Sequence, residues 1–230
     1  MKERVSPGMA LAIGVVAVFA VVALLFGFTV VSTEEEAALN VEFDPVAYVE
    51  ETWPTIQTTI AENAVPLADV LNRIEPDATG KATKESLTPV AEELGRITTG
   101  EAHVYRVSGS GTVTDVDTET SRGTIGLQVD GYEGPIEVRV YVGPRIPSDE
   151  SSIRDATGFI EFGDFRDQTE YGKVASEINK KVAEGLETVR AELTEGQAVT
   201  LTGALTMRTF NQPSIDVSTL TIVPIEVATS

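Results

Sequence analysis

An uncharged apolar run near the N-terminus is the feature that most constrains this chain. Residues 5–33 contain no charged side chain, whereas Lys2 and Arg4 precede the run and three glutamates at 34–36 follow it. A helix over residues 9–31 would satisfy its own backbone hydrogen bonds and is long enough to cross a membrane. Because basic residues stay on the cytoplasmic side, we expect a single span through the cytoplasmic membrane, with the remaining chain outside.

A cleaved secretory signal is the alternative to a permanent anchor, because it also has a basic start and an apolar middle. Signal cores usually run about 7 to 15 residues before a site of small residues. This run is longer and ends in Phe26, Phe28, Val30 and Val31, which favours an uncleaved anchor. The sequence has no cysteine, so it offers neither a disulfide nor a thiol for lipid attachment.

The charge of the chain limits its partners. Its 36 acidic and 17 basic residues give a formal net charge of −19. So negative a surface repels nucleic acid phosphates and anionic lipid headgroups, and it keeps an extracytoplasmic protein soluble. We therefore expect no nucleic acid partner.

The residues after the apolar run divide by their periodicity. Residues 1–33 are the cytoplasmic start and span, 34–43 an acidic stalk, 44–100 a helical subdomain, and 101–230 a β-rich domain. Asp44 and Pro45 mark the start of the first helix, and Pro54 should kink it. One shorter helix should begin at Pro66, and another should cover residues 84–97. The first helix should bury one face through a stripe of residues three and four apart: Val46, Val49, Trp53, Ile56 and Ile60.

Alternating apolar residues from about residue 101 predict strands. The first runs from residue 103 to 113 and is bent at its glycines, and two more cover 125–129 and 136–142. A long helix over 167–195 follows, with Asp167 and Glu170 as a capping box. Two last strands cover 199–201 and 215–222, the second bulged near Ser218. The fold class is α+β, a five-stranded OB-like antiparallel barrel with one long helix; the alternative is an open five-stranded sheet.

Three segments in order resemble a family of predicted periplasmic lipoproteins, domain of unknown function 2291. They are FDPVAYVEETWPTI at 43–56, LGRITTGEAHVYRVSGSGTV at 94–113 and YVGPRIPSDESSIRDATGFIEFGDFRDQTEYGKVASEIN at 141–179. The resemblance implies an extracytoplasmic protein, often encoded near sugar ABC transporter components. Many relatives resemble lipoproteins with an acylated cysteine, which this sequence lacks, so its apolar helix would replace the lipid anchor.

Residues for catalysis are scarce. His103 is the sole histidine, and no GxSxG elbow accompanies it, so we expect it to be structural or solvent-exposed. Glu161 and Asp164 are a weak candidate acid/base pair, because acids are abundant. The alternating acids at 115, 117 and 119 lack the glycine and terminal glutamate of a calcium loop. The glycines at 109 and 111 lack the rest of a nucleotide-binding motif. We expect no enzyme activity, metal or cofactor.

A binding hypothesis rests on the connection between the third strand and the long helix. There, Arg154 could recognise a carboxylate or a hydroxyl-rich ligand, or could simply pair with Asp155 and hold the loop. The full set of candidate ligand- or partner-binding residues is Trp53, Tyr141, Gly143, Pro144, Arg154, Asp155 and Phe162. Two functions follow: an anchored accessory protein that contacts envelope proteins, such as those of sugar transport, or a domain that binds a small molecule or carbohydrate.

Overall fold

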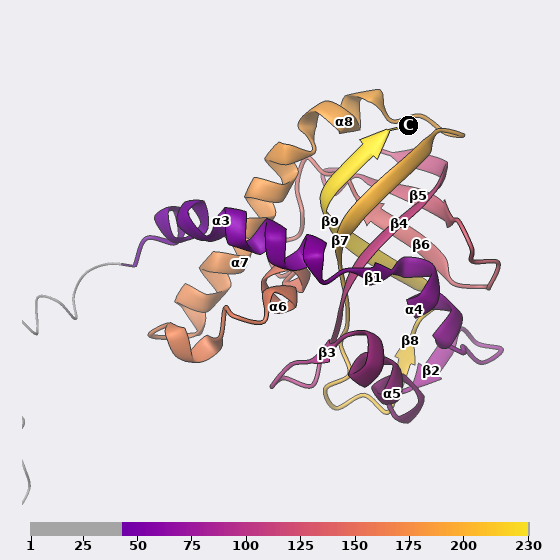
Figure 1. Ribbon diagram of the computed structural model, residues 1–230, viewed down its shortest axis with the longest axis horizontal. Helices are drawn as coiled ribbons and strands as arrows, with labels where there is room; N and C mark the ends of the chain where they lie inside the picture. The colour runs from indigo at the N-terminus through magenta and orange to yellow at the C-terminus, as the bar shows by residue number, and fades with distance from the viewer. Residues whose placement is uncertain (1–42, 230) are drawn as a thin grey trace, which may run out of the picture. The chain divides into compact units, whose positions relative to one another are not determined.

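Five strands pair in a ring at the centre of the computed structural model, which describes residues 43–229 (Figure 1). They are β4 (His103–Asp117), β5 (Thr124–Val129), β6 (Glu137–Tyr141), β9 (Thr219–Thr229) and β7 (Ala198–Met207). Each pairs with the next in that order, and β7 pairs back onto β4. An open sheet, the alternative to the predicted barrel, would lack this last pairing.

One junction of the ring differs from the expected antiparallel arrangement. β6 and β9 run parallel, with Val138 opposite Leu220 and Val140 opposite Ile222. A parallel pair needs a long connection, and the chain between these strands supplies it with helices and β7. The expectation of an all-antiparallel sheet was wrong at this point.

The first long strand bends where it changes partners. The register of β4 against β5 shifts between Val113 and Asp115, later than the glycines at which we predicted a bend. Gly111 has another role, because a Cβ there would lie 2.3 Å from the Gln128 carbonyl oxygen of β5. Two neighbouring backbones therefore approach at a point where only glycine fits.

The predicted last strand is two separate elements. β8 (Ser214–Asp216) pairs with β2 (Lys81–Thr83) in a small antiparallel sheet, and β9 begins only at Thr219. A Cβ at Gly80 would lie 2.8 Å from the Ser218 Cβ, and the N–H of Val217 donates to the Gly80 carbonyl. The change of phase near Ser218 thus marks a change of partner strand, where we had expected a bulge.

The helices before the ring begin as predicted. In α3 (Pro45–Glu62), the Asp44 carboxylate accepts hydrogen bonds from the N–H groups of Val46 and Ala47 at 2.9 and 3.1 Å. Val49, Ile56 and Ile60 are buried, but Val46 is exposed and Trp53 only half-buried, so the expected buried stripe was too long. Of the described residues, 44 onward form one compact unit.

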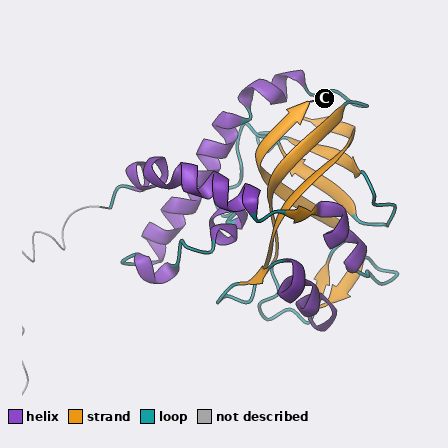
Figure 2. Cartoon of the chain, in the orientation of Figure 1, coloured by secondary structure: helices purple, strands orange, loops and turns teal. Residues whose placement is uncertain are grey.

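The remaining short elements lie around the ring (Figure 2). α4 (Leu67–Arg73) follows β1 (Val65–Pro66), which pairs with β4. α5 (Lys84–Leu94) ends three residues earlier than predicted, and Ile97 belongs to β3 (Arg96–Ile97), which also pairs with β4. In the part of the chain that the structure describes, no helix combines the length and apolar character of a membrane span; the predicted span at 9–31 lies outside it.

The predicted long helix is divided. α7 (Gln168–Gly185) is followed by α8 (Glu187–Glu192), which runs in a new direction, and Leu186 between them caps both (Figure 1). The Asp167 carboxylate caps α7 by accepting from the N–H groups of Thr169 and Glu170. In the predicted capping box Glu170 would accept from the N–H of Asp167. It accepts instead from the N–H of Arg166, one residue earlier. Contacts of α7 with α3 and α6 (Ser152–Thr157) place these helices on one side of the ring.

Candidate functional site

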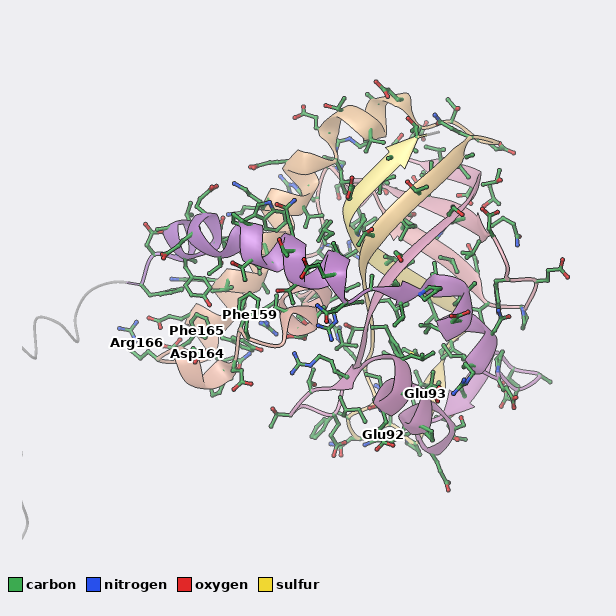
Figure 3. The ribbon with its side chains drawn as sticks, viewed as in Figure 1. Glu92, Glu93, Phe159, Asp164, Phe165 and Arg166 are labelled. Atoms are coloured by element: carbon green, nitrogen blue, oxygen red, sulfur yellow. The ribbon has the colours of Figure 1, made fainter. Side chains whose placement is uncertain are left out.

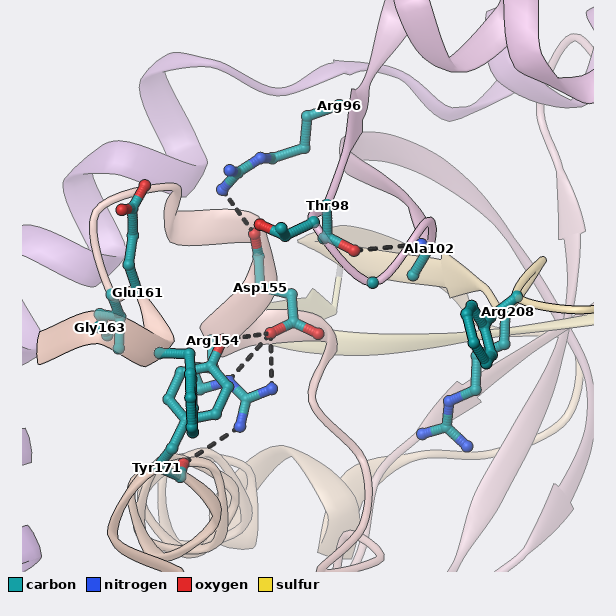
Figure 4. A pocket seen from close by; sticks show the side chains of 14 residues that line it. Arg96, Thr98, Ala102, Arg154, Asp155, Glu161, Gly163, Tyr171 and Arg208 are labelled. Carbon is teal, nitrogen blue, oxygen red and sulfur yellow. Dashed lines mark hydrogen bonds and ion pairs between the residues drawn. The ribbon is translucent and has the colours of Figure 1, made fainter. Parts of the chain in front are cut away.

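A groove of about 560 Å³ opens between the loop after β3, the α6 region and the end of β7 (Figure 4). Three arginines from these three segments line it: Arg96, Arg154 and Arg208. Two acidic residues, Asp155 and Glu161, also line it. Cations therefore outnumber acids here, although acids outnumber cations about two to one in the whole chain. Three aromatic side chains complete the walls: Phe162, Tyr171 and Phe210.

Arg154 and Asp155 form a buried ion pair at the base of α6. The Nε and Nη2 atoms of Arg154 lie 2.9 and 2.7 Å from Oδ1 of Asp155, and Nη1 donates to the Tyr171 carbonyl at 3.1 Å. Arg154 is only 8% exposed. Oδ2 of Asp155 accepts from the Ser151 hydroxyl at 2.6 Å. Because each group is held within the protein, this geometry favours the structural interpretation of the pair.

Tyr171 joins the pair to α7. The guanidinium carbon of Arg154 lies 3.5 Å from the centroid of the Tyr171 ring, which is a cation–π contact. The phenol oxygen of Tyr171 lies 3.4 Å from Oδ1 of Asp155, and burial raises the pKa of this phenol above its ordinary value. Figure 4 shows the ring beside the guanidinium group. The Arg154–Asp155 pair and the Tyr171 side chain thus form one wall of the groove.

Arg96 and Arg208 differ from Arg154 because their hydrogen bonds in the described protein go to carbonyl groups alone, with no carboxylate. Nη1 of Arg96 donates to the Asp155 carbonyl at 2.9 Å, and Nη2 of Arg208 donates to the Asp149 carbonyl at 2.9 Å. Within residues 43–229 neither has a carboxylate partner. Burial, and then the charge of Arg96, lower the pKa of Arg106, a cation that does not line the groove itself. The groove therefore carries positive charge that the described protein does not neutralise.

Exposed phenylalanines stand at two edges of the groove. Phe162 is 52% exposed and Phe210 is 61% exposed. Phe162 begins the short helical turn η1 (Phe162–Asp164), and its ring lies 5.7 Å from that of Tyr171 in an edge-on contact. Phe159, in the same segment, is also exposed.

The weak acid/base candidate has a structural role. Glu161 and Asp164 form a reciprocal capping box around η1, in which the Asp164 carboxylate accepts from the Glu161 N–H at 3.0 Å. Figure 3 shows Asp164, Phe165 and Arg166 together at this end of the molecule. The alternating acids are also accounted for in part, since Asp115 pairs with Arg139 at 2.9 Å. Within the described residues, no group of three potential metal ligands is assembled.

His103 is fully buried, so of the two predicted settings the buried, structural one holds. It begins β4, and its two ring nitrogens have no hydrogen-bond partner among the described residues. Burial, followed by the charge of Lys84, lowers its pKa. A histidine in this position cannot meet a ligand in the groove.

The structure separates the predicted binding residues into several places. Arg154, Asp155 and Phe162 line the groove, whereas Pro144 lines a second cavity. Gly143 precedes it in a left-handed turn, with φ of 68°. Tyr141 on β6 and Trp53 on α3 are half-buried and line neither cavity.

Sequence reasoning missed Arg96, Arg208 and Phe210. They lie at the ends of β3 and β7, more than 100 residues apart in the chain, and only the pairing of both strands with β4 brings them together. The available signal was weak: each arginine is followed within two residues by a short run that contains threonine with glycine or asparagine, at 98–100 and 209–211.

The ring of strands and the groove define a class: an OB-type α+β protein with an arginine-lined groove. An OB-fold protein from Thermotoga maritima has a similar structure, with a TM-score of 0.61 and 18% sequence identity. The likeness covers 82% of this chain and 99% of that chain, and it concerns the fold alone. None of the curated proteins has a matching sequence.

The chain belongs to the family of predicted periplasmic lipoproteins, domain of unknown function 2291, whose profile matches residues 18–228. This confirms the resemblance found in the three sequence segments. The family is extracytoplasmic by its description, and its function is unknown.

Proposed function

We propose that this protein is a non-enzymatic, extracytoplasmic binding protein that holds a small polar molecule in the groove. Residues 9–31 would anchor it as a single span, with the N-terminus in the cytoplasm. One observation carries the proposal: Arg96 and Arg208 have no carboxylate partner in the described protein and face a groove with exposed aromatic walls. Ligand sites commonly combine apolar walls with a few polar groups of this kind.

Carbohydrates and sugar acids fit this arrangement. Phenylalanine rings such as Phe162 and Phe210 can pack against the apolar face of a sugar ring, while guanidinium groups donate to its hydroxyl or carboxylate oxygens. The burial of His103 supports a binding role over catalysis, because the sole histidine cannot reach a bound molecule.

The test is a melting-temperature screen of the full chain in a nonionic detergent, with neutral sugars and sugar acids. A ligand that binds the native state raises the melting temperature. We expect Arg208→Gln and Phe162→Ala each to weaken binding by about tenfold. Phe159→Ala and Lys173→Gln are matched controls, because both residues are exposed and line neither cavity. A ligand whose affinity is the same in all four variants would place the site elsewhere.

A second function is favoured by the exposed aromatic side chains. Phe159, Phe162 and Phe210 are the kind of residue that anchors protein interfaces. In this function the protein is an accessory of other envelope proteins, such as those of sugar uptake. A pull-down from membranes should then recover a partner with the native chain and lose it with Phe162→Ala/Phe210→Ala, while the sugar screen shows no shift.

A further inference from the structure

We propose that a second cavity, of about 480 Å³, binds a compact oxyanion that carries two or more negative charges. It shares no residue with the groove and does not depend on the proposed function. Three segments meet there: the turn before β5, the loop after β6 and one face of α7. The lining residues are Ser121, Arg122, Pro144, Arg145, Ile146, Pro147, Ser148, Ser176, Asn179, Lys180 and Ala183.

The charge of this lining is the main argument. Arg122, Arg145 and Lys180 are cationic, and the lining has no acidic residue. Arg122 and Arg145 have no ion pair anywhere in residues 43–229, and Lys180 has one, to Glu177 at 2.5 Å. In a chain with 36 acidic and 17 basic residues, a lining of three cations and no acid differs from the average composition. Arg122 and Arg145 are thus like charges without an acidic partner in these residues, and a bound anion would offset their repulsion.

The framework of the cavity is held in place before any ligand binds. The Asn179 amide, on α7, donates to the carbonyls of Pro147 and Glu150 at 2.9 and 2.8 Å. The N–H of Arg145 donates to the Ser121 carbonyl at 3.1 Å. Asn179 is only 3% exposed, so its hydrogen bonds are protected from water. The loop therefore holds Arg145 in the same cavity as Arg122 and Lys180.

The nearby acids are already engaged or lie outside the lining. Oε1 of Glu150 accepts from the N–H groups of Ser151 and Ser152 at 2.9 and 3.0 Å and from the Ser152 hydroxyl at 2.5 Å. Glu177 is paired with Lys180, and Asp149 is exposed beside the loop. None of these carboxylates occupies the cavity.

The chemistry of the lining selects the ligand class. Guanidinium groups donate two parallel hydrogen bonds to phosphate, sulfate and carboxylate oxygens. The hydroxyls of Ser148 and Ser176 make no hydrogen bond within the described protein and can donate to the same oxygens. A phosphate or sulfate group matches three cations and two hydroxyls better than a neutral ligand does.

The experiment is a calorimetric titration of the full chain in a nonionic detergent, at constant ionic strength set with sodium chloride. Inorganic phosphate and glycerol 3-phosphate are titrated separately, to tell free phosphate from a phosphate on a lipid-like backbone. We expect binding of at least one probe, weakened about tenfold or more in Arg122→Gln/Arg145→Gln. Lys180→Gln should weaken it in the same direction, and Lys173→Gln, an exposed cation outside both cavities, should not change it.

The alternative outcomes are distinct. Absence of heat with both probes would overturn the proposal. Equal affinity in the native chain and the double variant would also overturn it, because the phosphate effect would then be one of salt in general. The substituted residues are all exposed, so the variants should fold, and circular dichroism checks this: Arg122, Arg145, Lys173 and Lys180. Sugar binding in the groove is measured independently and can succeed or fail without affecting this result.

Discussion

A few polar side chains in the core have buried atoms without a hydrogen-bond partner among the described residues. The two ring nitrogens of His103 and the Tyr105 hydroxyl are buried and have no hydrogen bond in the described protein. Both residues lie on the same face of β4, two positions apart. Burial raises the pKa of the Tyr105 phenol, and it is the main cause that lowers the pKa of His103. Each buried, unpaired group costs folding free energy.

His103 predicts how stability depends on pH. Its pKa is lower in the folded protein than its ordinary 6.5, so the unfolded chain takes up the proton first as the pH falls. The free energy of unfolding should therefore decrease from about pH 7 to about pH 5. His103→Leu should be less sensitive across this range, as urea unfolding at several pH values would show.

The comparison of the native chain with His103→Leu at more acidic pH is the control for this prediction. Hydrogen bonds lower the pKa of three exposed carboxyl groups below their ordinary value of 3.8: those of Asp77, Asp167 and Asp216. Their stabilisation is lost only as the pH falls below about 4. Both proteins should lose stability alike there. Parallel curves between pH 7 and 5 would show that His103 is not the group responsible.

The Arg154–Asp155 pair predicts a large and coupled effect on stability. Its side chains are 10% and 12% exposed, so removing one charge leaves the other buried without a partner. Arg154→Met should cost roughly 3 kcal/mol, and adding Asp155→Leu should cost less than the sum of the single changes. The Arg139–Asp115 pair, 24% and 49% exposed, is the control and should couple by less than about 1 kcal/mol. Denaturant unfolding of the four members of each cycle measures both.

Secondary structure elements were predictable where local chemistry determines them. Asp44 and Asp167 cap their helices, and the alternation at 124–129 and 137–141 is a paired meander, as expected. The division at Ser218 was not predictable, because it depends on β2, which lies more than 130 residues earlier in the chain. The groove was predicted only on its Arg154 side, since Arg96 and Arg208 meet through strand pairing.

The glycines of α7 predict a gain in stability. Gly172 and Gly185 lie in helical backbone, and a Cβ at either would meet no atom within 4 Å. Gly172→Ala should stabilise the protein by about 0.5 to 1 kcal/mol, because alanine loses less backbone entropy in a helix. Gly111→Ala is the opposite case and should destabilise, given the 2.3 Å approach to the Gln128 carbonyl. Thermal unfolding compares the two; a loss with Gly172→Ala would mean that α7 is strained.

The whole molecule carries a charge that opposes folding. With a net charge of −19 and few buried ion pairs among the described residues, repulsion between acids should exceed the attraction of surface pairs. Raising sodium chloride from 10 to about 200 mM should increase the urea midpoint, because the Debye length shortens to under about 10 Å. A decrease would show that the surface pairs dominate. Sodium sulfate is avoided, since it stabilises proteins through exclusion as well.

The strand β9 has a consequence for the order in which the chain can fold. It lies between β6 and β7, so the ring has a gap until residues 219–229 are available. When the chain is made from its N-terminus, the helices and the meander are complete before β9 is available to pair with β6 and β7. Such long-range pairing slows folding. The ring therefore closes last at β9, after the helices and the meander have been made.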